Sequence, residues 1–580
     1  MLDLATLHEA IAAAVPDREC LVWRDRRMTW REMSDRTRRL ANVLHGHGLG
    51  LHGLTQHGLT QHGHAQHGHA QHGHAQHGLA QHGLAQHGGG AANAWESPHD
   101  HLALYMHNGP EYLEGILGAH KARLAPFNVN YRYVDDELAH LFGDARPAAV
   151  IYHARFAPVI GRVAAALDRP PLLLQVADES GEALPPGALD YEEALAKASP
   201  EPLHDVRPDA GDLHILYTGG TTGMPKGVLW RIGDLMIGPL GMRHRDGTPL
   251  TDLGEAVEKA VRSDHRVLVG PPLMHGAGTW SSLGGWCGGG CVIFPDRVDG
   301  LDAADLMATA ERERATRMPL VGDAFARPIV EALEAREHDL GSLRTFVNSA
   351  AAISPDIKAR ILELLPHARI VDILGSSESG FQVARNGSSA RTFVPTPGTA
   401  VLSADRSRRL APGEDEMGWL AKGGDAIPLG YLGDPGKTAS TFLTVDGERL
   451  VVAGDRARLL ADGTVEVHGR EATTINTGGE KVFAEEVENV LRDLPGVADA
   501  LVLGRPSERW GTEIVAVIRP NGGAPGDAPS DAELRDGCAV HLARYKIPKA
   551  FVRTDLGLRL PNGKADYATA RTLLDGADPD

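Results

Sequence analysis

A loop rich in glycine and threonine, placed directly behind a mainly apolar stretch, constrains this chain more than any other feature. Residues 213–216 predict a buried strand, and residues 218–227 then contain four glycines, three threonines and Lys226. Glycines allow several backbone N–H groups to approach one anion, while hydroxyls and a lysine add donors and a positive charge. We therefore predict a polyphosphate-binding loop at the end of a strand.

Two other interpretations fit this loop less well. The loop is not a Walker A motif, because no Gly-Lys pair is followed by Ser or Thr, and Pro225 precedes Lys226. A flexible interdomain linker is the other alternative, but such linkers rarely follow a buried strand directly. The candidate phosphate ligands are Thr218, Gly219, Gly220, Thr221, Thr222, Gly223 and Lys226.

Length and charge limit the classes of protein to consider. A chain of 580 residues predicts two or more domains. Its content of 42% hydrophobic and 23% charged residues is typical of a globular protein, and no run of eighteen apolar residues predicts a transmembrane segment. The net charge of −18 argues against a general surface for nucleic acid or anionic membranes. A site for a polyanionic ligand must therefore be locally basic.

Cysteine usage favours a reducing compartment. The four cysteines, Cys20, Cys287, Cys291 and Cys538, are scattered without a disulfide framework, and no zinc-binding set completes the close pair. The first residues lack the basic region and apolar stretch of a signal peptide. We expect a cytoplasmic protein.

A low-complexity tract at residues 45–90 separates an expected helix at 30–44 from an expected strand at 101–106. Its core repeats a His/Gly/Gln pattern every five residues and holds 13 of the 29 histidines of the chain. Because this period fits neither a helix nor a strand, we expect a disordered insertion. Dense imidazoles bind zinc or nickel, so we also expect adventitious metal retention; the alternative is a tract that only stays solvated.

Strand patterns alternate with helix patterns through most of the remaining chain. Expected strands include residues 148–152, 172–176, 266–269, 291–294 and 369–373, and expected helices include 303–314, 326–335 and 355–364. This alternation predicts an α/β fold with mixed, largely parallel sheets.

The pattern changes to a small α+β unit after residue 470. Its expected helices are 485–494 and 531–545, and its expected strands are 498–503 and 513–518. We predict a large N-terminal domain at 1–470 and a small, mobile C-terminal domain at 471–580.

The phosphate loop resembles the signature of the adenylate-forming superfamily, which includes acyl-CoA synthetases, peptide-synthetase adenylation domains and luciferases. Gly219 stands where these proteins usually have a serine, and glycine keeps the backbone permissive. Five further segments resemble the motifs of the superfamily in their usual order, so the resemblance covers nearly the whole chain apart from the repeat. It implies a nucleotide-binding large domain and a mobile small domain.

The resemblance assigns an acid site and a metal site to the large domain. His275 resembles the histidine that lies beside the acyl carboxylate. Glu378 matches the magnesium-binding glutamate, and a hard cation such as Mg²⁺ requires oxygen ligands of this kind. Ser377 takes the place of a threonine and keeps its hydroxyl group.

The resemblance also implies a nucleotide site. Ala350 and Ala351 belong to a loop of small residues against which adenine lies in the family. Asp455 matches the aspartate that accepts hydrogen bonds from the ribose hydroxyls, and Arg470 matches an arginine that contacts ribose or phosphate beside the interdomain hinge.

Two loops of the small domain complete the resemblance. Gly478, Gly479 and Glu480 lie in a glycine loop that lines the tunnel for the coenzyme A pantetheine in acyl-CoA synthetases. Lys564 matches the catalytic lysine that meets the carboxylate and the α-phosphate as negative charge develops between them.

These motifs imply a two-step reaction. A carboxylate attacks the α-phosphorus of Mg-ATP, which gives acyl-AMP and pyrophosphate, while Lys226 holds the outer phosphates. The small domain then rotates, withdraws Lys564 and presents the loop at Gly478 and Gly479, and the thiol of coenzyme A attacks the acyl-AMP.

Three functions stay open at this stage. We favour an acyl-CoA synthetase for a hydrophobic medium-chain, long-chain or polycyclic acid, because residues 276–290 are mostly apolar and small and residues 128–133 and 427–431 resemble fatty-acyl and steroid side-chain CoA ligases. A stand-alone enzyme that loads a carrier-protein thiol is the second function, although we expect no fused carrier domain after Lys564. A metal-binding protein built on a degenerate ligase scaffold is the third.

Overall fold

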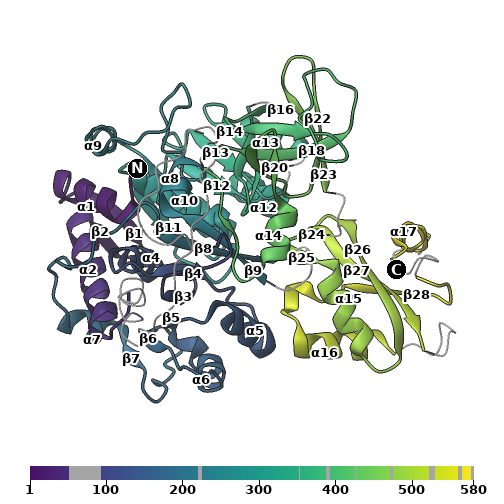
Figure 1. Ribbon diagram of the computed structural model, residues 1–580, viewed down its shortest axis with the longest axis horizontal. Helices are drawn as coiled ribbons and strands as arrows, with labels where there is room; N and C mark the ends of the chain where they lie inside the picture. The colour runs from purple at the N-terminus through teal and green to yellow at the C-terminus, as the bar shows by residue number, and fades with distance from the viewer. Residues whose placement is uncertain are drawn as a thin grey trace, which may run out of the picture.

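Two sheets with parallel strands at their centres form the large domain, and a third, smaller sheet forms the small domain (Figure 1). The computed structural model describes residues 1–50, 93–219, 225–351, 353, 355–386, 392–424, 426–470, 474–521, 529–558 and 565–576. The expected fold class, a large α/β domain followed by a small α+β domain, is confirmed.

Strand β8 of the first sheet leads into the predicted phosphate loop. Over the described residues its order is β19-β9-β8-β4-β3-β5-β6-β7. Strands β3 to β8 are parallel, and β8 turns back into the antiparallel strand β9. The bounds are β3 (His101–Tyr105), β4 (Ala125–Asn128), β5 (Ala149–His153), β6 (Leu172–Val176), β7 (Leu189–Asp190), β8 (Leu213–Gly219), β9 (Pro225–Arg231) and β19 (Gly430–Tyr431).

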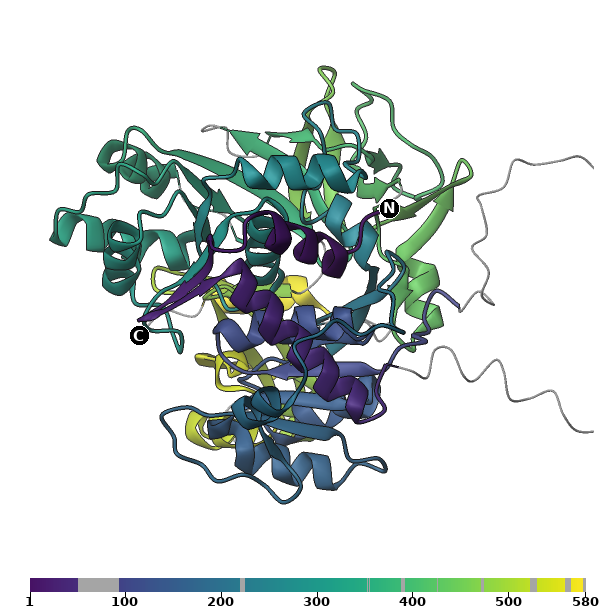
Figure 2. The same ribbon diagram turned by 90° about the vertical axis from the view of Figure 1, so that its left-hand side faces the viewer.

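Helices cover both faces of this sheet, as the fully buried parallel strands require. Along β3, Leu102 and Leu104 pack toward one face, and Ala103 and Tyr105 pack toward the other. The first face carries α1 (Leu4–Ala14), α2 (Trp30–Gly46), α4 (Pro110–Lys121) and α7 (Tyr191–Lys197). The second face carries α5 (Asp135–Ala145) and α6 (Ala157–Ala165). In Figure 2, α1 and α2 (purple) lie across the face of the large domain that is turned to the viewer.

The second sheet has a parallel half that shares the core with the first sheet. Its parallel strands are β1 (Glu19–Trp23), β11 (Cys291–Phe294), β10 (Arg266–Leu268), β12 (Arg317–Leu320), β13 (Thr345–Asn348) and β14 (Arg369–Ser376), with β2 (Arg26–Thr29) antiparallel at the edge. One face packs on α11 (Ala303–Arg312), α12 (Gly322–Ala335) and α13 (Pro355–Leu364). The other face packs on α10 (Gly276–Cys287), whose tryptophans belong to the core that also contains β3 and α4.

The same sheet continues as an antiparallel extension that the alternation of strands and helices did not predict. Its strands are β15 (Gly380–Asn386), β16 (Thr392–Pro395), β17 (Thr399–Leu402), β18 (Gly418–Gly423), β20 (Phe442–Val445), β21 (Glu448–Val451), β22 (Asp455–Leu459) and β23 (Val465–Arg470). Three short helices, α8 (Ile232–Ile237), α9 (Leu253–Val261) and α14 (Pro435–Thr441), complete the large domain within the described residues. The expectation of mixed, largely parallel sheets is confirmed: the two sheet centres are parallel and this extension is antiparallel.

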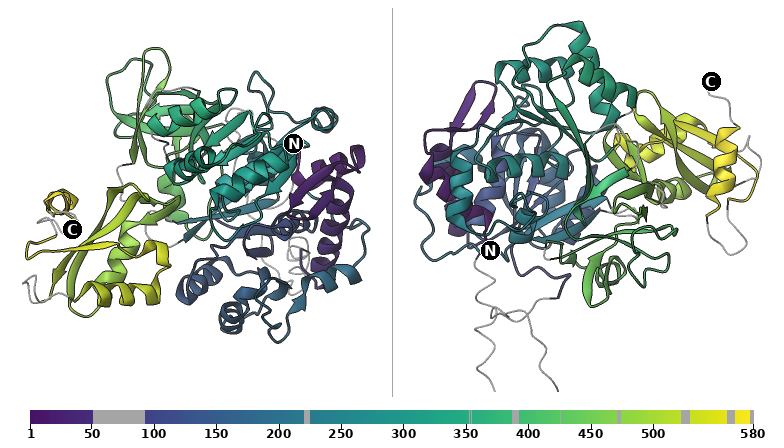
Figure 3. Two further views of the ribbon diagram at one scale, coloured as in Figure 1. Left: turned by 180° about the vertical axis from the view of Figure 1, so that it is seen from behind. Right: turned by 90° about the horizontal axis from the view of Figure 1, so that it is seen from above.

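The small domain contains a two-stranded and a three-stranded sheet within the described residues. Its elements are β24 (Thr474–Thr477), β25 (Glu480–Phe483), α15 (Ala484–Asp493), β26 (Val497–Ser507), β27 (Gly511–Pro520), α16 (Asp531–His541), the 3₁₀ turn η3 (Arg544–Lys546), β28 (Ala550–Arg553) and α17 (Tyr567–Asp575). Helices α15 and α16 pack on one face of the larger sheet and α17 packs on the other. Figure 3 shows this domain (yellow) at one side of the large domain, with α16 beside α5.

Most expected elements occur within a few residues of their expected bounds. Helix α2 ends at Gly46, so the first two residues of the expected tract at 45–90 belong to this helix. Residues 51–92 lie outside the described residues, and the expectation of a disordered insertion stays a prediction. The boundary at 470/471 also stays a prediction. No helix among the described residues is long and apolar enough to cross a membrane.

Candidate active site

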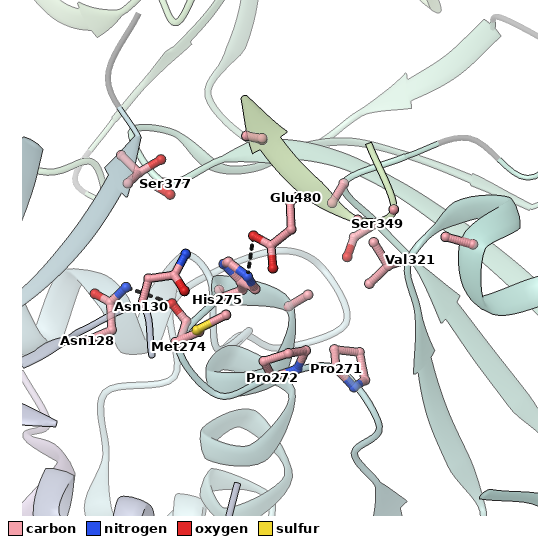
Figure 4. Close-up of a pocket in the computed structure, with 18 of the residues that line it drawn as sticks. Asn128, Asn130, Pro271, Pro272, Met274, His275, Val321, Ser349, Ser377 and Glu480 are labelled. Atoms are coloured by element: carbon pink, nitrogen blue, oxygen red, sulfur yellow. Dashed lines mark hydrogen bonds and ion pairs between the residues drawn. The ribbon is translucent and has the colours of Figure 1, made fainter. Parts of the chain in front are cut away.

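A cavity of about 350 Å³ lies where the two domains meet (Figure 4). Most of its wall comes from the carboxyl ends of parallel strands in the large domain, where ligands bind in open α/β sheets. The small domain supplies the rest of the wall through the turn between β24 and β25 and the residues that follow it, and through Arg509, Trp510, Tyr545 and Lys546. Of the predicted site residues, the cavity is lined by Thr218, His275, Ala350, Ser377, Gly478, Gly479 and Glu480.

His275 is the residue that precedes α10, and its side chain points at the small domain. Its Nε2 atom lies 3.0 Å from Oε2 of Glu480, but the two groups are not aligned for a hydrogen bond. Burial, and after it the positive charges of Arg132 and Lys481, lower the pKa of His275 to about 3. The imidazole is therefore neutral at ordinary pH and can donate or accept a hydrogen bond to an acid in the cavity.

Glu480 connects the two domains at this point. Besides its contact with His275, its carboxylate forms an ion pair with Arg132 of the large domain. The side chain of Glu480 is buried, and a buried carboxylate needs such a partner. This arrangement holds the β24–β25 turn against the cavity beside His275.

The turn itself requires glycine. Gly478 and Gly479 have φ angles of 57° and 87°, in the left-handed region that other residues rarely adopt. A Cβ atom on Gly479 would lie 3.1 Å from Cγ1 of Val321 in the large domain, and one on Gly478 would lie 3.1 Å from the Trp510 ring. Gly479 thus allows the backbone of the small domain to approach the large domain closely, and Gly478 allows the turn to pack on Trp510 within the small domain.

Only the two ends of the predicted phosphate loop are described. Strands β8 and β9 form a hairpin in which Thr218 pairs with Lys226, and Gly220–Gly223 lie outside the described residues. The Nζ atom of Lys226 lies 2.5 Å from Oδ2 of Asp434. Asp434 precedes α14, and its Oδ1 accepts a hydrogen bond of 2.8 Å from the backbone of Lys437. Lys226 is therefore held by the residue that caps a helix.

Glu378 is held by the same segment of chain. The hydroxyl group of Tyr431 donates a hydrogen bond of 3.0 Å to Oε1 of Glu378, and Tyr431 lies three residues before Asp434. The neighbouring backbone is fixed by Trp230, whose indole N–H donates to the carbonyl oxygen of Ser377 at 2.8 Å. The β19–α14 segment thus positions both the predicted metal ligand and the predicted phosphate lysine.

The chemistry of these donors fits Mg²⁺ bound together with a nucleotide. Glu378 offers carboxylate oxygen, the ligand that Mg²⁺ prefers, and Mg²⁺ usually takes one or two protein carboxylates and completes its shell with phosphate and water. Within the described part of the chain, no group of three or more His, Cys, Asp or Glu side chains could hold a metal alone. Glu378 would therefore hold Mg²⁺ jointly with phosphate oxygens.

The predicted nucleotide residues lie on the second sheet. Asp455 begins β22 and is buried. Its backbone lies opposite that of Arg470, at the end of the antiparallel strand β23. The side chain of Arg470 lies outside the described part of the molecule. Ala350 has a φ angle of 65°, which is unusual for a residue other than glycine, and its backbone faces the cavity. Ala351 is adjacent, and its carbonyl oxygen accepts a hydrogen bond from Asn348.

Two protein-family models match the chain. The model of the AMP-binding enzymes matches residues 95–432, and the model of the AMP-binding enzyme C-terminal domain matches residues 486–564. The chain belongs to the AMP-binding enzyme family. The predicted resemblance to the adenylate-forming superfamily is thereby confirmed.

Curated relatives and solved structures agree with this membership. A medium-chain acyl-CoA ligase, Mig, of Mycobacterium avium is 45% identical over 97% of this chain and 96% of its own length. A medium/long-chain-fatty-acid–CoA/3-oxocholest-4-en-26-oate–CoA ligase of Mycobacterium marinum is 33% identical over 100% of this chain and 98% of its own. A double mutant of the o-succinylbenzoate CoA synthetase of Bacillus subtilis, bound to a product analogue, shares the fold with a TM-score of 0.69 at 19% identity, covering 98% of both chains.

In this AMP-binding enzyme, Lys564 lies outside the described residues. Its described neighbours Leu558 and Ala565 pack with α17, on the face of the small sheet opposite α15 and α16. Neither neighbour is among the residues that line the cavity, whereas Gly478 and Gly479 are. The arrangement of the AMP-binding enzyme described here therefore brings the β24–β25 turn, and not the flanks of the Lys564 loop, to the cavity.

Several residues of this AMP-binding enzyme that line the cavity or hold a predicted site residue were not predicted from the sequence. Arg132 and Tyr431 lie in segments noted only for their resemblance to CoA ligases, while Asp434 and Lys546 were not singled out. The partners of these side chains are far away in the sequence, so no local pattern could identify them. The one available sequence signal concerned Asp434, because an aspartate directly before a proline predicts a helix cap.

Proposed function

We propose that this chain is an AMP-forming acid–thiol ligase that activates a hydrophobic carboxylic acid with ATP and transfers the acyl group to coenzyme A. The observation that carries this proposal is the contact of the Glu480 turn with His275, because it brings a glycine-lined backbone of the small domain to the acid end of the cavity. A second substrate that enters between the domains can reach the acyl group there. The names of the two relatives support coenzyme A as that substrate.

In the first step a carboxylate oxygen bonds to the α-phosphorus of ATP, and the bond from this phosphorus to the pyrophosphate oxygen breaks. Thr218, Lys226 and the phosphate loop bind the leaving pyrophosphate, and Lys564 stabilises the charge on the reacting oxygens. Neutral His275 orients the acid. Mg²⁺ held at Glu378 supplies charge neutralisation of the phosphates when bound.

In the second step the sulfur of coenzyme A bonds to the acyl carbon, and the bond from this carbon to the AMP oxygen breaks. The thiol proton leaves to solvent, and AMP is the leaving group. The protein's contribution is alignment: the turn at Gly478 and Gly479 leaves room for an extended substrate chain, and Glu480 and Arg132 keep that turn in place.

The walls of the cavity support a hydrophobic acid. Apolar side chains from α10, α12 and β15 line it, and Trp280 lies edge-on to Phe381 with ring centroids 5.8 Å apart. The volume falls within the range of sites for drug-sized ligands. We therefore propose a medium-chain, long-chain or polycyclic acid, in keeping with the substrates named for the two relatives.

The location and the histidine repeat form a further part of the proposal. All four cysteines are buried free thiols, which supports a cytoplasmic location. For the repeat we propose adventitious binding of zinc or nickel, on the basis of its 13 histidines. Removal of residues 51–90, which contain 11 of these histidines, should strongly reduce metal retention and leave ligase activity intact.

The experiment that tests the proposed function offers a panel of acids with ATP and Mg²⁺, with coenzyme A, with a carrier protein, or with no acceptor. We expect pyrophosphate release with hydrophobic acids, and AMP and thioester only when coenzyme A is present. Thioester on the carrier protein alone would favour the carrier-loading enzyme. Lys564→Ala should abolish pyrophosphate release and spare thioester formation from supplied acyl-AMP.

A further inference from the structure

A buried cluster of charged side chains joins the two domains away from the phosphate loop. Lys546 lies in η3 of the small domain, and its Nζ atom is 2.5 Å from Oε1 of Glu137 and 2.6 Å from Oε1 of Glu486. Glu137 belongs to α5 of the large domain, and Glu486 belongs to α15 of the small domain. The three side chains are only 4%, 4% and 5% exposed, so solvent does not screen the cluster.

The surroundings keep Lys546 charged. Burial favours the neutral amine, but Glu486, Tyr133 and Glu137 outweigh burial and raise the pKa of Lys546 above its ordinary value. The ammonium group also lies 5.1 Å from the Tyr133 ring and 5.8 Å from the Tyr545 ring, within the range of cation–π attraction. A buried charge of this kind is stable only while its carboxylate partners stay in place.

One of those partners depends on the arrangement of the domains. Glu486 stays beside Lys546 in any arrangement, because both belong to the small domain. Glu137 does not, because it is fixed to α5, where its Oε2 accepts a hydrogen bond from the backbone of Val134. A rotation of the small domain therefore breaks the Lys546–Glu137 contact and leaves a buried or newly hydrated charge on each side.

The contact belongs to the same interface as the Glu480 turn. The amide of Asn130 donates to the hydroxyl of Tyr545, the neighbour of Lys546, at 3.1 Å, and Arg132, two residues after Asn130, forms the ion pair with Glu480. The segment at 130–137 thus contacts the small domain both at the turn and at Lys546. The Lys546–Glu137 ion pair therefore also holds the turn at the cavity.

We propose that Lys546 is a positioning residue for the thioester-forming step: its ion pair with Glu137 holds the small domain in the arrangement that brings the Gly478–Glu480 turn to the cavity. This role rests on the proposed function, in which that arrangement serves the attack of coenzyme A. The first step uses Lys564, whose neighbours lie on another face of the small domain, so it does not depend on the Lys546–Glu137 contact.

Two substitutions test the proposal from opposite sides of the interface. Lys546→Met keeps the length of the side chain and removes the charge. Glu137→Gln removes the charge from the large domain and keeps an oxygen for the backbone of Val134. The matched control is Asp136→Asn, which removes the neighbouring ion pair between Asp136 and His541. The two groups are 3.0 Å apart, and the side chains of Asp136 and His541 are 68% and 49% exposed. An exposed pair of this kind contributes little.

The two half-reactions are measured separately on the full chain. Acyl-AMP formation is followed by pyrophosphate–ATP exchange without coenzyme A, and thioester formation is followed from supplied acyl-AMP and coenzyme A. We expect Lys546→Met and Glu137→Gln to slow thioester formation about tenfold or more and to change exchange by less than about twofold. The double variant should be little slower than either single variant, because both changes remove one contact. Asp136→Asn should match the wild type in both assays.

Other outcomes separate the two proposals. Equal losses in both half-reactions, or no loss in either, would overturn the positioning role, since a purely structural lysine affects both steps alike. If Lys546→Met does not fold, Glu137→Gln still gives the decision, because the residue lies in the other domain. Absence of exchange and thioester formation in the wild type with every acid would instead reject the proposed function.

Discussion

The Nζ atom of Lys226 lies 2.5 Å from Oδ2 of Asp434, so the strand that leaves the phosphate loop is joined to the start of α14. The same carboxylate caps this helix through the backbone of Lys437. A lysine that is already held in one conformation loses less side-chain entropy when phosphate binds. Asp434 is therefore expected to position Lys226 for ATP although it does not bind ATP itself.

Replacing Asp434 with Asn should raise the KM for ATP about three- to tenfold with little change in kcat, because an amide keeps the helix cap and loses the ion pair. The measurement is pyrophosphate–ATP exchange at varied ATP. Asp252→Asn is the matched control, since Asp252 caps α9 in the same way, with a hydrogen bond of 2.8 Å from the backbone of Glu255. An unchanged KM in Asp434→Asn would show that the ion pair does not position Lys226.

Tyr431 should tune the metal requirement through Glu378. Tyr431→Phe removes the hydroxyl that donates to Oε1 of Glu378 at 3.0 Å. Loss of such a partner of a metal ligand typically costs tenfold or more in affinity, so the Mg²⁺ concentration for half-maximal exchange should rise about tenfold. Tyr112→Phe is the control, because the Tyr112 hydroxyl is buried without a hydrogen-bond partner. Superimposable Mg²⁺ curves for Tyr431→Phe and wild type would contradict this prediction.

Gly479→Ala should impair thioester formation selectively. The residue has a φ angle of 87°, and a Cβ atom would lie 3.1 Å from Val321 across the interface. The substitution combines backbone strain with a collision between domains, so we expect a loss of about tenfold or more from supplied acyl-AMP. Gly447→Ala has similar strain, with φ at 78°, and open space around the new methyl group. Equal effects of the two substitutions would remove the collision as the cause.

His275 should not titrate in the arrangement that brings the Gly478–Glu480 turn to the cavity. Burial, then Arg132 and Lys481, lower its pKa to about 3, so the imidazole stays neutral from pH 5.5 to 8. The rate of thioester formation from supplied acyl-AMP should show no inflection near pH 6.5, the ordinary value for histidine, that depends on His275. His275→Gln should lower this rate and keep the shape of the profile. An inflection near pH 6.5 that disappears in His275→Gln would contradict a neutral role.

Glu486 should make the second step sensitive to pH. Burial raises the pKa of its carboxyl group to about 7, with Lys546 opposing and Glu137 adding to the rise. Lys546 of η3, Glu137 of α5 and the rings of Tyr133 and Tyr545 are the titratable groups around it. Separation of the domains would remove Glu137 and expose this carboxyl group to solvent, so we expect the closed arrangement to bind its proton more tightly than an open one does. The closed arrangement is thus favoured at low pH and loses this advantage as the pH rises to about 7.

The check is the pH profile of thioester formation from supplied acyl-AMP in Glu486→Gln and in wild type. The ratio of the variant rate to the wild-type rate should increase between about pH 5 and 7 and become constant above that. The ratio removes the effect of the ionisation of the coenzyme A thiol, which both enzymes share. A ratio that does not depend on pH would show that Glu486 does not titrate with domain closure.

Local patterns were sufficient for the elements and for the large-domain loops. The strands at Leu172–Val176 and Cys291–Phe294 and the helix at Pro355–Leu364 have the expected bounds. The antiparallel extension was missed because its strands are short and mostly separated by turns, with only the short helix α14 among them to mark an alternation. Roles could be predicted for Lys226 from its loop and for Glu378 from the resemblance, but their partners Asp434 and Tyr431 could not be predicted in this way.

By itself the sequence determined a nucleotide-binding α/β enzyme with a small second domain, because glycine spacing and apolar periodicity are read from neighbouring residues. Only the tertiary structure decided which face of the small domain meets the cavity. Lys546 and Glu137 are 409 residues apart, and the position of one relative to the other depends on how two separately folded cores pack together. Their contact arises from burial of charge at an interface, and no periodicity in either segment specifies it.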